Sequence, residues 1–246
     1  MDNKYIYLKA ERDKEFVIAS MRKYVTEKQE LDKKLEELIT PFIKGKSMKI
    51  LDACCGIGHI PYFLSDISPK SSFLGIDINQ FLIAEAKKLC KNNPNIQFEV
   101  GDIFNPPAKF NKYFDISINW KTASWLPYYD DLLKSLINVT KNHIFLSSLF
   151  YNGDIDFEIK VREYKKNAGK DGFNGYYNVY SFPHFKEFVY DLGAKNVESY
   201  DFEINKDIPK PPVDQMGTYT VKLDEGGRLQ ISGCVIMMWK IIRIDM

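Results

Sequence analysis

The sequence predicts an α/β protein built on a doubly wound, mostly parallel β-sheet. Short apolar, β-rich runs alternate with segments of helical periodicity, which is the pattern of successive strand–helix units. The first run leads directly into a glycine turn, "DACCGIGHI", as expected where a parallel strand enters a helix. The length of 246 residues suits one domain with a small cap.

Residues 1–45 are predicted to form an N-terminal helical cap. Apolar residues recur there at helical spacing among Glu and Lys, and Gly45 is placed to end the helix. The recurring residues are Leu31, Leu35, Leu38, Ile39 and Phe42.

Buried strands and helices are predicted to alternate after this cap. The expected strands are "MKILDA", "SFLGID", "IQFEV", "FDISI" and "HIFLSSLF". The expected helices lie near residues 58–66, 79–91, 129–141 and 181–192. Asn79 and Ser181 are suitable N-caps, and Gly193 is a suitable C-terminal stop.

Two later segments depart from this alternation. Residues 151–180 form a stretch of about thirty residues, longer than a normal crossover, and are predicted to be an inserted substrate lid. The segment "TYTVKLDEGGRLQISGCVIMMW" predicts a hairpin with Gly226 and Gly227 in its turn. We therefore expect a single domain over residues 1–246: the cap, a cofactor-binding half (46–150), the lid, and a C-terminal helix and hairpin (181–246).

Composition and charge exclude several classes. Hydrophobic residues make up 45%, charged residues 27%, and the net charge is +1, so no general field favours nucleic acid or an anionic membrane. The charged N-terminus and the lack of an apolar run of about 18 residues predict neither a signal peptide nor a membrane span. The four cysteines have no metal-ligand spacing, so we expect no disulfide, no metal site and a cytosolic setting.

The glycine turn is compatible with more than one ligand. A P-loop needs a lysine after its second glycine to reach the terminal phosphates, and none is present, which excludes that class. A dinucleotide fingerprint needs a third glycine, but Gly56 and Gly58 are followed by Pro61 at that place. The dinucleotide interpretation is weakened and stays open.

The stretch "ILDACCGIGHIPYFL" resembles motif I of class I S-adenosylmethionine-dependent methyltransferases, commonly written LDxGxGxG. Asp52, Gly56 and Gly58 match this motif, whereas Cys54 replaces its first glycine and is expected to hold the backbone to ordinary φ/ψ values. The resemblance spans roughly residues 45–150 by motifs and the remainder by element order. It implies a seven-stranded Rossmann-like sheet with an antiparallel last strand, for which "ISGCVIMMW" is the expected segment.

The resemblance also implies which residues hold S-adenosylmethionine. Asp77 ends the second strand, where an acid can bind both ribose hydroxyls. Asp102 follows the third strand, where the family places an acid near the adenine amino group, and Asn119 ends the fourth strand beside the methionine half. The full expected set is Asp52, Cys54, Cys55, Gly56, Gly58, Asp77, Ile78, Asp102, Ile103, Asn119 and Trp120.

Other residues near the turn favour structural roles. His59 stands at a helix start, and capping or packing is favoured over catalysis. Cys54 and Cys55 are interpreted as packing residues, since no partner base is evident. The "NPPA" stretch at 105–108 follows the wrong strand for an amino-methylating motif and predicts a proline turn.

Candidates for acceptor chemistry lie after the fourth strand and in the lid. The loop "NWKTASWLPYYDD" is aromatic, and aromatic faces attract a cation such as a sulfonium, so Trp120 is expected near the cofactor or substrate. Tyr128 and Tyr129 are expected to be structural. The catalytic candidates are Arg162, which can clamp an anion, and Tyr180 and His184 as base or hydroxyl orienter.

The expected activity is methyl transfer to a small polar or anionic molecule, with oxygen favoured over nitrogen and no nucleic-acid or membrane partner. The C-terminal tail is similar to tails of bacterial methyltransferases linked to surface-polysaccharide and phosphoramidate modification. The alternatives are an NAD-dependent oxidoreductase, a non-catalytic S-adenosylmethionine-binding protein, and an aminopropyl transferase, which would need paired acids where "NWKTASW" supplies a lysine.

Overall fold

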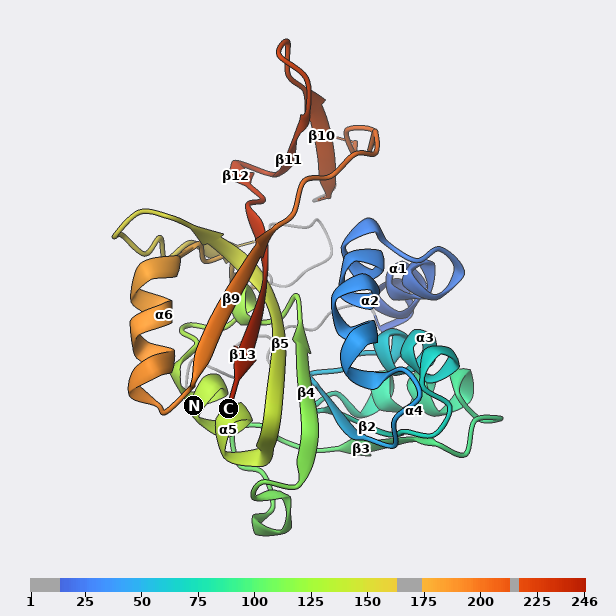
Figure 1. Cartoon of the computed structure of the whole chain (residues 1–246). Coiled ribbons are helices and arrows are strands. Elements are labelled where there is room, and N and C mark those ends of the chain that lie inside the picture. The colour runs from blue at the N-terminus through green and yellow to red at the C-terminus, as the bar shows by residue number, and fades with distance from the viewer. Residues whose placement is uncertain (1–13, 163–173, 213–216) are drawn as a thin grey trace.

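A twisted β-sheet forms the middle layer of the molecule in a computed structural model that describes residues 14–162, 174–212 and 217–246 (Figure 1). The strand order is β3-β2-β1-β4-β5-β13-β9, and β8 (Tyr180–Ser181) adds to β5. The strands are β1 (Lys49–Ala53), β2 (Ser72–Asp77), β3 (Ile96–Val100), β4 (Phe114–Trp120), β5 (Thr140–Tyr151), β9 (Asn196–Asp201) and β13 (Trp239–Asp245). This arrangement confirms the predicted fold class, but β8 and β9 were not among the expected strands.

The last strand of the sheet is antiparallel, as expected, but it is not the predicted segment. Strands β1 to β5 pair in parallel, whereas β13 runs antiparallel to both β5 and β9. The expected strand "ISGCVIMMW" is wrong, because the chain turns at Gly233, where φ is +60°, and the central strand starts only at Trp239.

Helices cover both faces of the sheet. They are α1 (Lys14–Thr26), α2 (Glu30–Ile43), α3 (His59–Ile67), α4 (Gln80–Leu89), α5 (Asp130–Val139) and α6 (Phe182–Asp191), with short 3₁₀ turns η2 (Ala108–Phe110) and η3 (Ala123–Trp125). Buried side chains of α2, α3 and α4 pack on one face, and those of α5 and α6 pack on the other. The predicted helices are confirmed, except that α5 ends before residues 140 and 141, which begin β5.

The ends of the helices follow the sequence signals. Ser181 caps α6, its Oγ accepting from the backbone N–H of His184 at 3.3 Å. Gly193 after α6 and Gly45 after α2 have φ of +94° and +75°, which glycine adopts without strain. Asn79 precedes α4 as expected but makes no side-chain capping bond.

The N-terminal cap is anchored by α2. Its residues Leu31, Leu35, Ile39 and Ile43 are at most 4% exposed. Each such burial is worth about 1.5–3 kcal/mol, so the apolar stripe of α2 explains why the helix stays on the sheet. One charged residue, Asp32, lies on this buried side and is 3% exposed.

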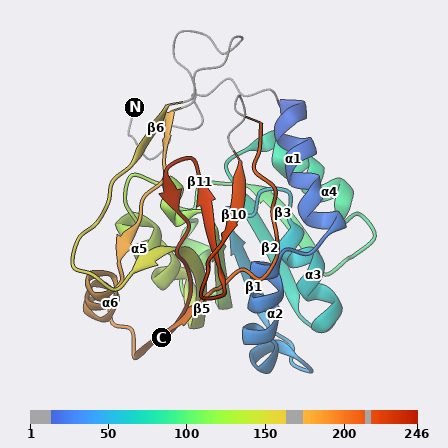
Figure 2. The same ribbon diagram turned by 90° about the horizontal axis from the view of Figure 1, so that it is seen from above.

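The described parts of the predicted lid (151–162 and 174–180) and the hairpin contain small separate sheets. The lid contains the antiparallel pair β6 (Lys160–Arg162) and β7 (Asn174–Tyr176). The predicted hairpin is present in β10 (Thr218–Lys222), β11 (Arg228–Ser232) and β12 (Val235–Ile236), with Gly226 and Gly227 at positive φ, but it lies outside the central sheet. It stands beyond the start of β13 in Figure 1 and in front of the central sheet in Figure 2. Since Trp239 of β13 is opposite Leu149, this end of the molecule is the carboxyl end of β5.

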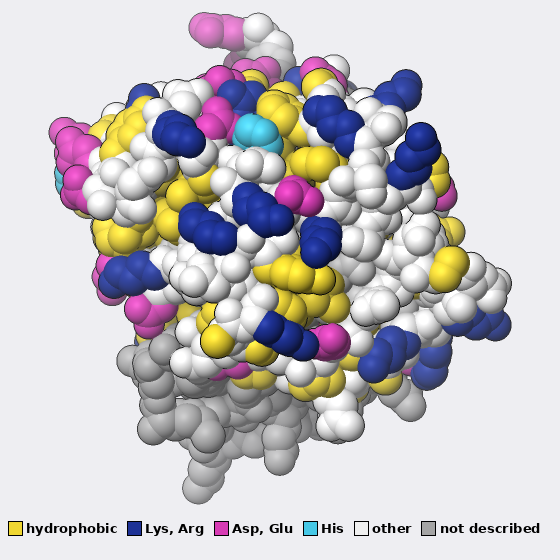
Figure 3. Space-filling model, turned by 60° about the horizontal axis from the view of Figure 1, so that its bottom comes forward, with side chains coloured by type: hydrophobic (Ala, Val, Ile, Leu, Met, Phe, Trp, Pro, Cys, Tyr) yellow, Lys and Arg dark blue, Asp and Glu magenta, His cyan; other side chains and the backbone are white. Residues whose placement is uncertain are grey.

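The surface opposite the hairpin is mixed in charge. Lys and Arg side chains are scattered there among acidic and apolar ones instead of gathering in one patch (Figure 3). None of the helices in the three described ranges has the length and apolarity that crossing a membrane requires.

Candidate functional site

The glycine turn joins β1 to α3 through three residues in left-handed conformations. Cys54, Gly56 and Gly58 have φ of +62°, +55° and +74°. The expectation that Cys54 keeps ordinary φ/ψ values is therefore wrong, because the surrounding turn imposes the conformation that glycine has in the family motif. A non-glycine residue held this way costs of order 1–3 kcal/mol, and such strain is typical of functional turns.

Side chains pack tightly around the turn. A Cβ on Gly58 would lie 2.3 Å from Cζ of Phe98, so the ring of this β3 residue requires a glycine at the start of α3. A Cβ on Gly56 would lie 2.9 Å from Cε of Met21, which places the α1 side chain directly over the turn. Pro61 at the third position is buried in the first turn of α3.

Asp77 ties the end of β2 to the glycine turn. Its Oδ2 accepts from the backbone N–H of Gly56 at 2.9 Å, and its Oδ1 accepts from that of Asn79 at 2.8 Å. Burial raises the pKa of Asp77, while hydrogen bonds from Asn79, Gly56 and Ile78 oppose that rise. The carboxylate is thus held in a fixed orientation at the edge where the resemblance places the ribose.

Asp52 and Asn119 stand near the carboxyl ends of neighbouring strands, where Asp52 is opposite Ile118 and Asn119 is opposite Ala53, and both side chains keep an unused acceptor. The amide nitrogen of Asn119 donates to the carbonyl oxygen of Ala53 at 3.0 Å. Oδ2 of Asp52 and Oδ1 of Asn119 are buried without a hydrogen-bond partner. Burial, then the nearby charges of Asp77 and Asp32, raise the pKa of Asp52 well above its ordinary value.

The two cysteines of the turn have inert thiols. Burial is the main reason that the pKa of Cys54 and that of Cys55 are both raised well above the ordinary value, and the charges of Asp77 and Asp52 add to it. The structure agrees with packing roles for these residues, because a thiol that stays protonated is a poor nucleophile.

The expected adenine residues follow β3. Asp102 accepts from the backbone N–H of Phe104 at 2.9 Å and from the side chain of Asn105 at 2.6 Å. Ile103 is 5% exposed, and its carbonyl oxygen accepts from the Ser135 hydroxyl of α5. This loop is therefore ordered by local bonds. Its turn spans residues 102–105, where the backbone N–H of Asn105 donates to the carbonyl oxygen of Asp102, and the prolines that follow lead into η2.

A buried polar cluster that the sequence analysis did not identify joins the cap to the end of β4. Oδ1 of Asp32 accepts from Nε1 of Trp120 at 2.7 Å and from Nζ of Lys121 at 2.9 Å. Nε2 of His59 lies 3.8 Å from Oδ2 of Asp32, and the His59 ring centroid is 5.5 Å from that of Tyr24. The available signal was a carboxylate at helical spacing from Leu35 and Ile39, on the apolar side of a predicted helix.

His59 does not cap α3, because the N-cap residue is Gly58 and no side-chain capping bond forms. Both ring nitrogens of His59 are buried without a hydrogen-bond partner. Burial lowers the pKa of His59 to about 4, with Asp32 opposing and Lys121 adding to the shift. The ring contacts of His59 with Tyr24 and Phe63 agree with a packing role. Packing alone does not explain why both buried ring nitrogens lack a hydrogen-bond partner.

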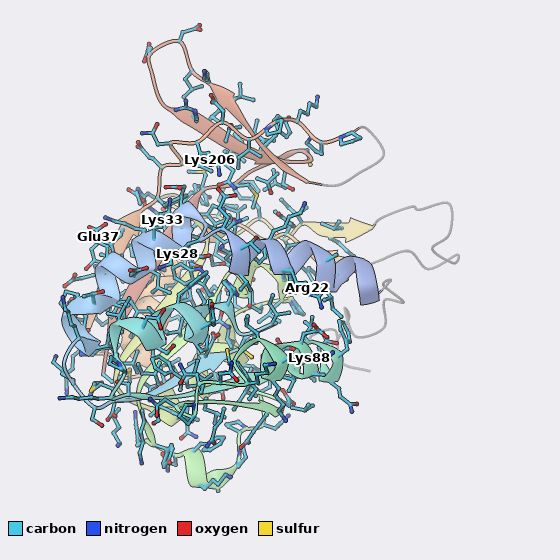
Figure 4. The ribbon with its side chains drawn as sticks, turned by 90° about the vertical axis from the view of Figure 1, so that its right-hand side faces the viewer. Arg22, Lys28, Lys33, Glu37, Lys88 and Lys206 are labelled. Carbon is cyan, nitrogen blue, oxygen red and sulfur yellow. The ribbon has the colours of Figure 1, made fainter. Side chains whose placement is uncertain are left out.

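The cap also contacts α4 and the segment before the hairpin through charged pairs. Arg22 of α1 donates to Glu85 of α4 at 2.8 Å, and Lys206 pairs with Glu27 at the end of α1. Figure 4 shows Arg22 on the same side of the molecule as Lys88 of α4, and Lys206 beyond α2 at the base of the hairpin. These pairs are exposed, so each is expected to contribute little to stability.

The structure describes the surroundings of two of the three catalytic candidates, and neither lies at the glycine turn. Tyr180 is 0% exposed, and its hydroxyl donates to the carbonyl oxygen of Ala123 at 3.1 Å, so this side chain belongs to the core. His184 is exposed on α6, which packs on the sheet face opposite α3, so the sheet separates it from the glycine turn. Arg162 ends β6, and its side chain lies outside the described residues.

The aromatic loop after β4 is mainly structural. Tyr129 is 1% exposed and stacks on Tyr128 with ring centroids 4.5 Å apart, which agrees with the expected structural role. Trp125 packs edge-on against Tyr177 of the lid at 4.7 Å. Trp120 is 6% exposed, and its indole N–H donates a hydrogen bond to Asp32. This side chain therefore joins the cap to the end of β4.

Comparison with known proteins identifies the family. Residues 44–176 match a family model described as a methyltransferase domain. A malonyl-[acyl-carrier protein] O-methyltransferase of Bacillus anthracis is 28% identical over 104 residues, which cover 42% of this chain and 38% of that protein. A protein of Acanthamoeba polyphaga mimivirus, provisionally named RNA methyltransferase R405, is 44% identical over 75 residues, covering 29% of this chain and 19% of that protein.

A solved structure extends the likeness to most of the fold. The N-terminal domain of EvdMO1 with SAH bound has a TM-score of 0.57 at 13% identity, covering 88% of this chain and 81% of that one. The matches to the two named relatives span well under half of either relative's length. The family model, by contrast, covers more than half of this chain and the whole glycine turn. The chain therefore belongs to the methyltransferase domain family, as the class I resemblance implied.

Proposed function

We propose that the chain is an S-adenosylmethionine-dependent methyltransferase that acts on a small polar or anionic acceptor, with oxygen as the favoured methyl acceptor atom. This proposal rests on a group of buried polar side-chain atoms that have no hydrogen-bond partner. Among the described residues six such side-chain atoms occur, and five of them belong to Asp32, Asp52, His59 and Asn119. Each costs about 1–3 kcal/mol if nothing binds it, so their gathering beside the glycine turn indicates a site built for a polar ligand.

The residues present fit S-adenosylmethionine. When bound, this cofactor supplies an electrophilic methyl group carried on a sulfonium. We assign the ribose to Asp77, whose orientation is fixed by Gly56, and the adenine to the loop at Asp102 and Ile103. The unpartnered oxygens of Asp52 and Asn119 are acceptors for the ammonium of the methionine half.

The chain itself contributes alignment and exclusion of water. Met21 covers the glycine turn, and the buried stripe of α2 closes the cluster around Asp32 from solvent. Holding the acceptor atom in line with the methyl carbon in a dry site supplies much of the rate enhancement in transfers of this kind. Membership of the methyltransferase domain family argues against the NAD-dependent oxidoreductase.

The proposed acceptor class is supported by the name of one relative and by composition. The Bacillus anthracis relative is an O-methyltransferase, and the matched part covers 38% of it. The match to the mimivirus protein covers 19% of that protein, which is too little to extend an RNA substrate to this chain. A surface-polysaccharide or phosphoramidate acceptor, expected from the tail, receives no support from these relatives.

The function can be tested by methyl transfer. Purified protein is incubated with isotopically labelled S-adenosylmethionine and two panels of small molecules, one of hydroxyl compounds and one of carboxylates, and labelled products are identified by mass. Transfer that is lost in Asp77→Ala is the expected result. Tight binding of NADH with no transfer to any compound would contradict the proposal.

A further inference from the structure

His59 and Asp32 form a pair whose arrangement differs from simple packing. Asp32 is on α2, outside the residues matched by the family model, and His59 is the first residue of α3 after the glycine turn. Their side chains are 1% and 12% exposed, with Nε2 of His59 3.8 Å from Oδ2 of Asp32. This separation is too long for a hydrogen bond, so Asp32 acts on the ring through its charge, and both ring nitrogens keep their capacity for a ligand.

The carboxylate is held in place on its other side. Oδ1 of Asp32 accepts from Trp120 at 2.7 Å and from Lys121 at 2.9 Å. Trp120 ends β4 and Lys121 follows it, so both donors come from the carboxyl end of this strand, and Oδ2 is left on the side of His59. Such fixation is what a positioning carboxylate requires, since a freely rotating one would not select one ring orientation.

The remaining partners of the ring are aromatic. Tyr24 of α1 lies against His59 with ring centroids 5.5 Å apart, and Phe63 of α3 meets it edge-on at 6.5 Å. Nδ1 of His59 is buried and has no hydrogen-bond partner. A buried imidazole nitrogen that no protein group satisfies costs about 1–3 kcal/mol, unless a ligand group binds it.

We propose that His59 is the proton acceptor of the methyl-transfer reaction and that Asp32 positions it, so that the acceptor is a hydroxyl compound that must lose its proton, and not a carboxylate. This inference rests on the proposed function. A carboxylate is already ionised at neutral pH and needs no base, whereas an alcohol or phenol becomes a good nucleophile only as its proton leaves.

The groups that face His59 keep its ring neutral at physiological pH. Asp32 of α2 favours the protonated ring, while Lys121 after β4 and the burial of the ring disfavour it, giving a pKa of about 4. Tyr24 of α1 faces the ring as a neutral phenol, since burial, with Asp32 adding to it, raises its pKa. A neutral ring at physiological pH is the form that a general base needs.

The acceptor oxygen forms a bond to the methyl carbon while the carbon–sulfur bond breaks, and that electron pair stays on the sulfur. The hydroxyl proton moves to Nδ1 of His59, and the resulting cation is stabilised by Asp32. Proton transfer by a positioned base contributes typically about 10²–10⁴-fold to such a reaction.

The first test compares His59→Gln with wild type on phenols of graded acidity and on benzoate. We expect the variant to bind S-adenosylhomocysteine with unchanged affinity and to methylate weakly acidic phenols roughly 10²–10⁴-fold more slowly. Its rate should rise tenfold per pH unit below the phenol's pKa, whereas the wild-type rate should be flat from about pH 5 to 8. A residue with a merely structural role would not change the pH profile.

The matched control is His143→Gln. His143 also pairs with a carboxylate, Asp245, at 2.7 Å, but it lies near the start of β5 and away from the glycine turn. We expect this variant to keep the wild-type rate and pH profile. A methylation rate of His59→Gln within threefold of the wild-type rate overturns the inference, and so does methylation of benzoate alone. If S-adenosylhomocysteine still binds in either case, the proposed function stands.

A second measurement decides the matter if no tested compound is methylated. Nitrogen-15 NMR of the imidazoles in the complex with S-adenosylhomocysteine should show His59 neutral at pH 7, with one nitrogen unprotonated and free of a hydrogen bond. In Asp32→Asn we expect the nitrogen-15 shifts of the His59 ring to show that the proton has moved to the other ring nitrogen. A ring that is doubly protonated, or whose two nitrogens are both hydrogen-bonded in the complex, overturns the inference, because no base would then be available.

Discussion

Two histidine–aspartate pairs lie at opposite ends of the same sheet and differ in nearly every respect. His143 near the start of β5 and Asp245 at the end of β13 are 2.7 Å apart and 26% and 21% exposed. Asp245 also accepts from Arg243 at 3.0 Å and from Asn196 at 3.3 Å. The oxygens of this carboxylate are therefore satisfied by protein groups alone.

The pair of His59 and Asp32 is nearly fully buried, and its heavy atoms approach only to 3.8 Å. One Asp32 oxygen and both His59 nitrogens are left without partners. A pair that serves stability makes its own bonds, whereas a pair that keeps unmet bonds in the interior gives up stability for a ligand. This difference supports our proposal that the functional site lies at the carboxyl end of β1 and β4.

The largest expected effect is on stability at the buried pair. Asp32→Ala leaves Nε1 of Trp120 and Nζ of Lys121 without an acceptor, and breaking a buried pair in this way costs about 3 kcal/mol or more. Urea unfolding measures this loss. The matched control is Lys34→Ala, which removes an exposed pair with Glu37 and should change the free energy of unfolding by less than about 0.5 kcal/mol. Equal losses in the two variants would remove the distinction between buried and exposed pairs.

The next effect is a pH dependence of stability. The folded-state pKa of His59, about 4, lies below its ordinary value of 6.5. Below about pH 6.5 this histidine becomes protonated in the unfolded chain, whereas in the folded chain it stays neutral down to about pH 4. The free energy of unfolding therefore falls over this range, by roughly 3 kcal/mol. Unfolding of wild type and His59→Gln between these pH values measures it, and parallel curves for the two proteins would show that His59 makes no such contribution.

A somewhat smaller effect is expected on cofactor affinity. Asp77→Ala removes the proposed ribose acceptor and the bond that holds Gly56, and should weaken S-adenosylhomocysteine binding by about 1.5–3 kcal/mol. Calorimetry measures the change. Unchanged affinity in a folded variant would exclude the ribose assignment.

The smallest effect is expected at the satisfied pair. Burial raises the pKa of Asp245, but hydrogen bonds from Arg243, His143 and Asn196 outweigh burial and lower it overall. Its contribution is therefore present at neutral pH and is lost as pH falls through the folded-state pKa. Asp245→Ala should cost about 1–2 kcal/mol at pH 7 and leave S-adenosylhomocysteine affinity unchanged. A loss of affinity in this variant would show that the two ends of the sheet are coupled.

The sequence predicted most of the parallel half of the fold. The runs leading to β1 through β5 are short, apolar and separated by helices with clear stop signals such as Gly45 and Gly193, so local pattern was enough. It did not predict that β13 starts at Trp239, because "VIMMW" is apolar throughout and its division between β12 and β13 depends on pairing with β5 and β9. Pairing of distant strands leaves no local mark.

For the site, residues near the motif were easier to predict than residues brought in from elsewhere. Asp52, Gly56 and Asp77 were identified because they surround one turn, and the structure brings them together. Asp32 was missed because it is more than twenty residues from that turn in an apolar helix stripe. Tyr180 and His184 were named for their chemistry alone. Tyr180 is buried in the core, and His184 is exposed on α6, on the other face of the sheet from α3.

The most direct measurement is a calorimetric titration of the protein with S-adenosylhomocysteine. Saturable binding at one site, weakened in Asp77→Ala and unchanged in Asp245→Ala, is the result predicted by a cofactor site at the carboxyl end of β1 and β4. A folded protein that takes up no S-adenosylhomocysteine would contradict it.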